Sequence, residues 1–154
     1  MSYESRIERA DNGEILLRLP EHERALLRGI AVSIRDRLSA DDDDPVLRRL
    51  FPPAYADPER EDEYRDLTRA QLLTGRERAL ELLEATVDRD SLSPEEADSW
   101  LRALNDMRLV LGTALDVEED LDWDAIGPEN PRAPEYAMYG YLSWIQEQLV
   151  EATA

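Results

Sequence analysis

One helical segment, from Trp100 to Thr113, most constrains the fold of this chain. Its sequence is WLRALNDMRLVLGT, and at 3.6 residues per turn its apolar side chains cover nearly all of its sides. These residues include Trp100, Leu101, Ala103, Leu104, Met107, Val110 and Leu111. A helix that is apolar on almost every side must be enclosed by other elements. We therefore expect this segment to be the central helix of a helical bundle.

Three polar residues, Asn105, Asp106 and Arg108, interrupt the middle of the segment, and Gly112 follows one turn after Arg108. Asn105 and Arg108 share a stripe with Gly112 and are expected to be half-buried neighbours, so their polar atoms need partners. One interpretation is a polar network that fixes the register of the helices. The other is a recess that accepts a ligand or a peptide. Arg108 separates the two, because Arg108→Met should cost about 3–5 kcal/mol if buried carboxylates lose their partner, and little if Arg108 faces solvent.

The N-terminal part predicts a β-hairpin and then a helix. Residues 5–19 place apolar residues on both sides of Asp11-Asn12-Gly13, and Asn-Gly is a strong signal for a tight turn. The helix begins near Pro20, with Glu21 and Glu23 beside the positive end of its dipole. Its expected core stripe is Leu27, Ile30, Ile34 and Leu38. Its arginines 24, 28 and 35 indicate a solvated side that pairs with nearby carboxylates, or a surface for an acidic partner.

Further helices follow along the chain. A short one is expected over Val46–Leu50, and a long one from about Pro58 to Val87, in which Gly75 marks a kink, a break or a close helix crossing. Ser93 begins the central helix with a capping box, and a last helix follows Pro134. The sequence therefore predicts a mainly α protein. It is expected to be one domain over 1–154, with the hairpin at 5–19 and a bundle of about four to five helices over 20–154.

The last helix is unusually aromatic. Its expected core stripe is Met138, Leu142, Ile145 and Leu149, and its aromatic residues include Tyr139, Tyr141 and Trp144. Such side chains supply much of the burial in a small domain, so core packing is the first interpretation. An exposed aromatic surface for a protein partner is the alternative.

Charge restricts the partners. The net charge is -18, with 36 acidic residues against 18 cations that are all arginine. An acidic chain opposes direct binding to nucleic acid and to anionic membranes, whereas it suits a basic protein partner. The N-terminus has no apolar signal core and no apolar run is long enough to span a bilayer, so a cytoplasmic location is expected. The oligomeric state is left open, with a homodimer as one option.

No catalytic, metal or cofactor motif is recognisable. The chain has no cysteine and one histidine, His22, with Leu26 where a zinc-protease helix needs a second histidine. There is no glycine-rich phosphate loop and no nucleophile elbow. We therefore expect no enzymatic activity, cofactor or metal. An unrecognised small-molecule or metal-dependent enzyme with a site near Asn105 and Arg108 is kept as an alternative.

Three stretches carry a family resemblance: DPVLRRLFPPAY from Asp44, WLRALNDMRLVLGT from Trp100 and YGYLSWIQEQL from Tyr139. In order and spacing they resemble the actinobacterial AosR family, formerly a domain of unknown function, over the whole chain. The resemblance implies a non-enzymatic regulator of oxidative-stress transcription that binds an alternative sigma factor. A neighbouring Clp-adaptor gene in the family suggests a proteolysis-associated adaptor as an alternative. Redox sensing in the family uses cysteine, and no position of this chain can carry it.

Overall fold

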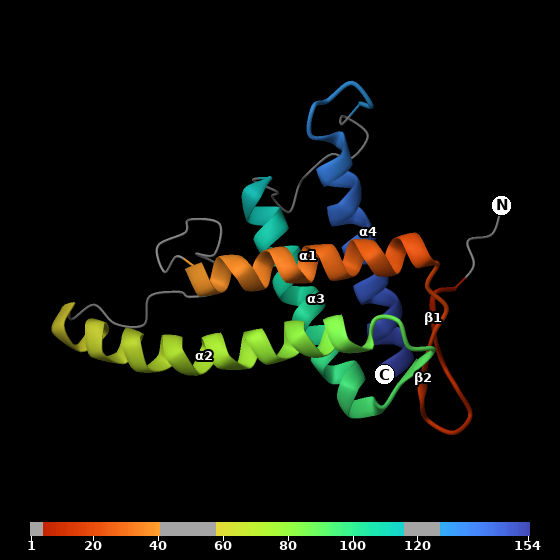
Figure 1. The fold of residues 1–154 in the computed structure, drawn as a ribbon, viewed down its shortest axis with the longest axis horizontal. Coiled ribbons are helices and arrows are strands. Elements are labelled where there is room, and N and C mark those ends of the chain that lie inside the picture. The colour runs from red at the N-terminus through yellow and green to blue at the C-terminus, as the bar shows by residue number, and fades with distance from the viewer. Residues whose placement is uncertain (1–4, 41–57, 116–126) are drawn as a thin grey trace.

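Four helices and a small antiparallel sheet make up the part of the chain that the computed structural model describes, residues 5–40, 58–115 and 127–154. In chain order the elements are β1 (Ile7–Arg9), β2 (Ile15–Leu17), α1 (Glu21–Ala40), α2 (Pro58–Thr86), β3 (Ser91–Leu92), α3 (Pro94–Ala114) and α4 (Ala133–Thr153). This confirms the mainly α fold with an N-terminal hairpin (Figure 1). The short helix expected over Val46–Leu50 lies outside the described residues. No described helix is long and apolar enough to cross a membrane.

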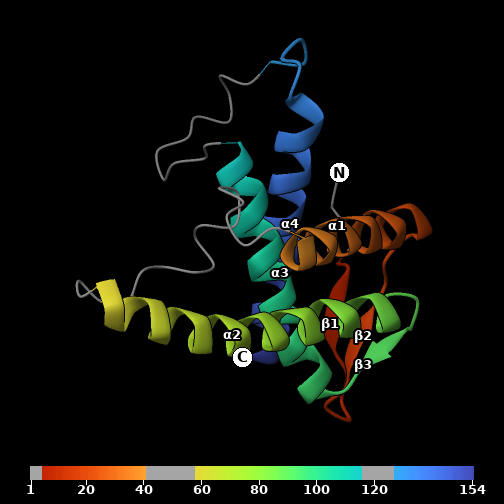
Figure 2. The ribbon, with the colours of Figure 1, turned by 60° about the vertical axis from the view of Figure 1, so that its left-hand side comes forward.

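The helices form two antiparallel pairs that cross each other. In both ribbon views α1 and α2 lie side by side, and α3 and α4 run beside one another across them (Figures 1 and 2). α3 packs against each of the other three helices, and Trp100, Leu104 and Met107 on it are fully buried. The expectation that the apolar segment forms the central helix is therefore confirmed.

The start of α3 follows the predicted cap. The Ser93 hydroxyl accepts a hydrogen bond from the Glu96 backbone N–H at 3.1 Å, and the Glu96 carboxylate accepts one from the Ser93 N–H at 2.8 Å. The second bond, together with nearby Arg89, holds the pKa of Glu96 below its ordinary value. Farther along α3, the Trp100 indole N–H donates to the Thr86 hydroxyl at 2.8 Å, which anchors α3 to the end of α2.

The sheet has the order β1-β2-β3, with Ile7 opposite Leu17 and Ile15 opposite Leu92. Gly13 takes a φ of 89°, as the hairpin turn requires. The strand β3 was not predicted, because two residues between helices are too few to show an alternating pattern. The α4 helix packs against β1 and covers the edge of the sheet.

On α1 and α4, two residues that were expected in the core lie at the margin of the core. The α1 stripe buries Leu27, Ile34 and Leu38, but Ile30 is half-buried. On α4, Leu142, Ile145 and Leu149 are buried, whereas Met138 is half-buried near the N-terminal end of the helix. The prediction that Met138 is a full core residue is wrong, because α1 crosses α4 and leaves this turn beside a groove.

The long helix α2 is continuous through Gly75. A Cβ at this position would meet no atom within 4 Å. Gly75 therefore marks neither a break nor a close helix crossing within the described residues.

Candidate functional site

The polar residues of α3 point to two different helices and do not form one network. Asp106 faces α2, where Arg76 forms an ion pair with it. Arg108 faces α4, where it donates to the Gln146 side-chain oxygen at 3.2 Å. Asn105 is exposed and makes no side-chain hydrogen bond to a described residue. The expectation that Asn105 and Arg108 are half-buried together is therefore wrong for Asn105, which lies on the outer side of α3.

Asp106 is the most buried charged residue on α3, at 2% exposure. Burial raises the pKa of Asp106, and the hydrogen bond and charge of Arg76 oppose this rise. A hollow of about 280 Å³ lies beside the pair, and its lining includes Gln71, Gly75, Arg102 and Asn105. A recess beside the polar residues of α3 therefore exists, but it lies on the α2 side of the helix and does not include Arg108.

The Arg108 side chain contributes to the seam between α3 and α4. Its guanidinium carbon lies 5.9 Å from the centroid of the Tyr139 ring. One turn later, a Cβ at Gly112 would come within 3.0 Å of the same ring. Gly112 therefore permits the close approach of α4, and both Arg108 and Gly112 lie against the Tyr139 ring.

Replacing Arg108 with methionine is expected to change stability by less than about 1 kcal/mol. The residue is half-buried, and its described contacts are a neutral amide and an aromatic ring, so no buried carboxylate loses a counter-charge. Urea unfolding of the wild type and Arg108→Met measures the difference. A loss of 3 kcal/mol or more would contradict the assignment of Arg108 to a neutral environment.

The two glycines at 29 and 112 should respond differently to alanine. Gly29→Ala is expected to stabilise by about 1 kcal/mol, because alanine favours the helix and its Cβ would enter open space. Gly112→Ala must move the Tyr139 ring, so we expect it to be at least about 1 kcal/mol less stable than Gly29→Ala. Denaturant unfolding of both variants tests this, and equal stabilisation would contradict the close approach at Gly112.

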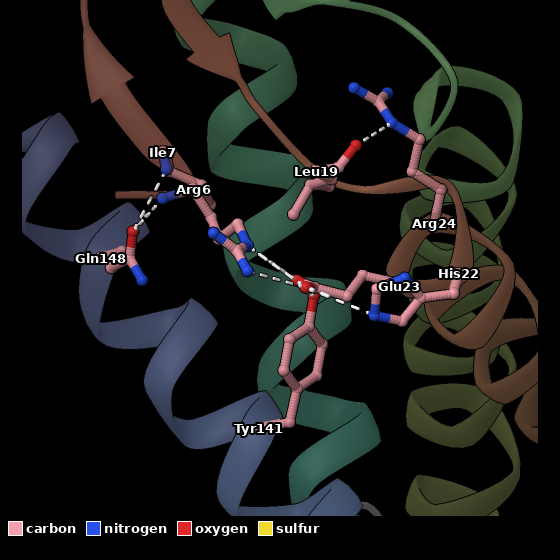
Figure 3. Close-up of polar contacts among 8 residues, drawn as sticks. All are labelled: Arg6, Ile7, Leu19, His22, Glu23, Arg24, Tyr141 and Gln148. Atoms are coloured by element: carbon pink, nitrogen blue, oxygen red, sulfur yellow. Dashed lines mark hydrogen bonds and ion pairs between the residues drawn. The ribbon is translucent and has the colours of Figure 1, made fainter. Parts of the chain in front are cut away.

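A second polar cluster, centred on Glu23, joins the hairpin, α1 and α4 (Figure 3). Glu23 is 7% exposed, and its carboxylate pairs with the Arg6 guanidinium at 3.1 Å. It also accepts a hydrogen bond from the Tyr141 hydroxyl at 2.7 Å. Burial, and then the hydrogen bond and charge of Glu23, raise the pKa of Tyr141. The cluster therefore fixes the start of α1 to the middle of α4.

The same region attaches β1 to α4. The Gln148 side-chain oxygen accepts hydrogen bonds from the backbone N–H groups of Arg6 and Ile7, at 2.8 and 3.1 Å (Figure 3). The Arg6 guanidinium also lies 5.6 Å from the centre of the Trp144 ring. Sequence reasoning gave Glu23 a role only in the first turn of α1 and did not single out Arg6 or Gln148. No local pattern marks the cluster, because Glu23 and Tyr141 are 118 positions apart.

The aromatic residues of α4 are thus divided between two contacts. Tyr139 packs at the α3 seam, while Tyr141 and Trp144 lie at the hairpin side, with ring centres 6.1 Å apart. All three are half-buried. This arrangement favours packing as their main role, and a partner surface made of their exposed parts stays a prediction.

The arginines of α1 mostly connect α1 to its neighbours. Arg28 pairs with Asp88, and Arg35 pairs with Glu84 at 2.9 Å. Arg24 instead donates mainly to backbone carbonyls, including those of Leu19 and Val87 at 2.7 and 2.6 Å. The interpretation that these cations pair with nearby carboxylates is confirmed for Arg28 and Arg35, and Arg24 chiefly holds chain segments together.

An apolar groove of about 420 Å³ lies between α1, α3 and α4. Its α1 side includes Ala25, Leu26, Gly29, Ile30 and Ser33, and its opposite side includes Val110, Leu111, Ala114 and Met138. Gly29 has open space around it, since an added Cβ would meet nothing within 4 Å. The half-buried Ile30 and Met138 both line this groove. Among the described cavities it is the one whose shape and apolar lining suit a protein segment.

The fold and these sites define a helical protein whose polar clusters join its own elements and which carries an open apolar groove between α1, α3 and α4. No cluster of three or more potential metal ligands occurs among the residues described. The chain belongs to the family described as Domain of unknown function (DUF2017), whose model matches residues 4–153.

Named relatives were found among curated proteins. Two of them, the "Oxidative stress regulator AosR" of Mycobacterium tuberculosis and that of Mycobacterium bovis, are 28% identical to this chain. The alignment covers 94% of this chain and 84% of each relative. The "Putative oxidative stress regulator AosR" of Mycobacterium leprae is 28% identical over 71% of this chain and 58% of its own length. The resemblance to the AosR family is confirmed, and no solved structure matches the chain.

Proposed function

We propose that this chain is a non-enzymatic regulator of the oxidative-stress response that acts by binding a protein, an alternative sigma factor. The observation that carries the proposal is the similarity to named oxidative stress regulators over 94% of the chain. Because that similarity extends over nearly the entire sequence, the proposal concerns the whole fold and not one borrowed motif.

The electrostatics support a protein partner over direct contact with DNA. A net charge of -18 repels phosphates, and a DNA-binding surface would need clustered cations. Arginines 28, 35 and 76 pair with carboxylates within the fold. The charge instead accelerates association with basic proteins.

The polar clusters support the non-enzymatic part of the proposal. Asp106 and Glu23 pair with arginines, and Tyr141 donates to Glu23, in contacts that join one element of the fold to another. Since this sequence contains no cysteine, the proposal assigns to the chain the binding of the partner and not thiol-based sensing.

Co-purification from the source cells tests the proposal. The tagged full chain, isolated before and after peroxide treatment, should recover a sigma factor, and the purified sigma factor should then bind the purified chain directly. Recovery of chaperones alone would contradict the proposal. Tight binding of Clp components without a sigma factor would replace it with the adaptor function.

A further inference from the structure

We infer that the groove between α1, α3 and α4 is the docking site for an amphipathic helix of a partner protein, with basic residues on its polar side. The inference names the site and the kind of segment that the proposed function would use, and its biological meaning rests on that function.

The α1 side of the groove is shaped for close helix packing. Ala25, Gly29 and Ser33 recur every four residues, so they form a single row along the helix, and all three are exposed. Small side chains allow a second helix to approach the α1 backbone closely. A partner helix lying along this row would meet no large side chain from α1 at its centre.

The walls of the groove supply apolar contact area. Leu26 and Ile30 flank the small residues on α1, while Leu111 and Met138 stand on the opposite side. All four are half-buried, so each retains apolar surface to bury against a partner. This combination matches the recognition mode in which an amphipathic helix places residues at i, i+3, i+4 and i+7 into an apolar groove.

The charge of the chain favours a partner segment with a basic polar side. Glu21 lies one turn before Ala25 and Asp36 lies one turn after Ser33, and both are exposed. These two acids stand near the ends of the small-residue row, about 22 Å apart along α1 at 1.5 Å per residue. Arg37 lines the groove one turn after Ser33, so the attraction for a basic segment comes from Glu21 at the other end and from the charge of the whole chain. With a net charge of -18 on the whole chain, a basic segment is attracted, whereas a second copy of this chain is repelled.

Synthetic peptides provide the probe. Three 20-residue peptides are compared: an amphipathic Leu/Lys helix, the same helix with Glu in place of Lys, and a peptide that has the composition of the first in scrambled order. Fluorescence anisotropy with the full chain gives the dissociation constant of each peptide. The amphipathic Leu/Lys helix should bind at least tenfold more tightly than either of the other two peptides. Equal binding of the scrambled lysine peptide would overturn the inference, because any cation would then suffice.

A matched pair of glycine variants locates the binding. Both Gly29 and Gly75 lie within helices and have open space where a Cβ would stand, so leucine should be tolerated at each, which thermal melting checks. Gly29→Leu fills the groove and should weaken binding of the amphipathic lysine peptide at least tenfold. Gly75→Leu lies on α2, away from the groove, and should leave the affinity unchanged. Unchanged affinity in Gly29→Leu would overturn the inference.

Two further outcomes separate the groove from the proposed function. If wild type and Gly29→Leu bind the sigma factor equally, the groove is not its site, although the regulator function stands. If neither binds a sigma factor while the peptide still requires Gly29, the groove stands and the proposed function fails. A wild-type dimer that Gly29→Leu converts to monomer would assign the groove to a second copy and overturn the inference.

Discussion

Arg76→Met is expected to destabilise the protein by about 3–5 kcal/mol at pH 7. Arg76 is the cation paired with Asp106, whose side chain is only 3% exposed. Removing the guanidinium leaves a carboxylate buried between α2 and α3 without a counter-charge. Chemical denaturation of wild type and variant gives the difference in unfolding free energy. Arg102→Met, on the exposed side of α3 beside the same hollow, is the matched control and should cost little.

The loss of unfolding free energy in Arg76→Met, relative to the wild type, should become smaller as the pH falls. Burial already raises the pKa of Asp106 above 3.8, and Arg76 opposes that rise, so its removal raises the pKa further. A raised carboxyl pKa means that the folded state binds the proton more tightly than the unfolded state. Protonation of Asp106 removes the unpaired buried charge. The variant therefore regains stability relative to the wild type as the pH falls through the folded-state pKa of Asp106. A loss that is constant from pH 7 to pH 4 would contradict a buried, charged Asp106.

Replacing both partners should cost far less than replacing Arg76 alone. In Arg76→Met with Asp106→Leu, neither charge remains to be desolvated, so stability should return to within about 1–2 kcal/mol of the wild type. A double variant as unstable as Arg76→Met would indicate that packing, and not charge pairing, explains the loss.

Glu23→Leu is the second large effect, expected to cost about 3 kcal/mol. The change removes the partner of the Arg6 guanidinium and the acceptor of the Tyr141 hydroxyl, which lie at 3.1 and 2.7 Å. Glu21→Leu is the matched control, because Glu21 is exposed and lies in the same first turn of α1. It should cost only the few tenths of a kcal/mol due to the helix dipole.

Hydrogen exchange locates the effect of Glu23→Leu. The amides of Arg6 and Ile7 donate to Gln148 in the region held by the cluster, so they should exchange faster in Glu23→Leu and not in Glu21→Leu. Equal exchange in both variants would contradict the role of Glu23 in attaching β1 to α4.

Tyr141, in the same cluster, is expected to make stability depend on pH in the alkaline range. The pKa of Tyr141 is raised above 10, so its contribution to stability is complete below pH 10 and is lost as the pH rises above that value. Tyr141→Phe should therefore be less stable than the wild type at pH 7, and the gap should narrow above pH 10. A gap that does not change between pH 8 and pH 11 would show that the hydroxyl is not held in its neutral form.

The family motif around Trp100 illustrates how far sequence reaches. Its apolar residues predicted a central helix, and its capping residues predicted the start near Ser93, because both signals lie within one element. The same stretch gave the wrong environment for Asn105 and did not identify Asp106 as the buried charge. Helical spacing groups residues by side, but it does not say which neighbouring helix each side meets.

The sequence alone determined the mainly α class, the hairpin turn at Gly13, most of the α1 and α4 core stripes and the acidic surface, since periodicity, capping and charge are local properties. Tertiary structure decided which polar residues meet, as in the pairs of Asp106 with Arg76 and Glu23 with Tyr141. It also decided that Ile30 and Met138 line a groove and not the core. These outcomes depend on the angle at which two helix pairs cross, which is fixed by side-chain packing between residues distant in the chain.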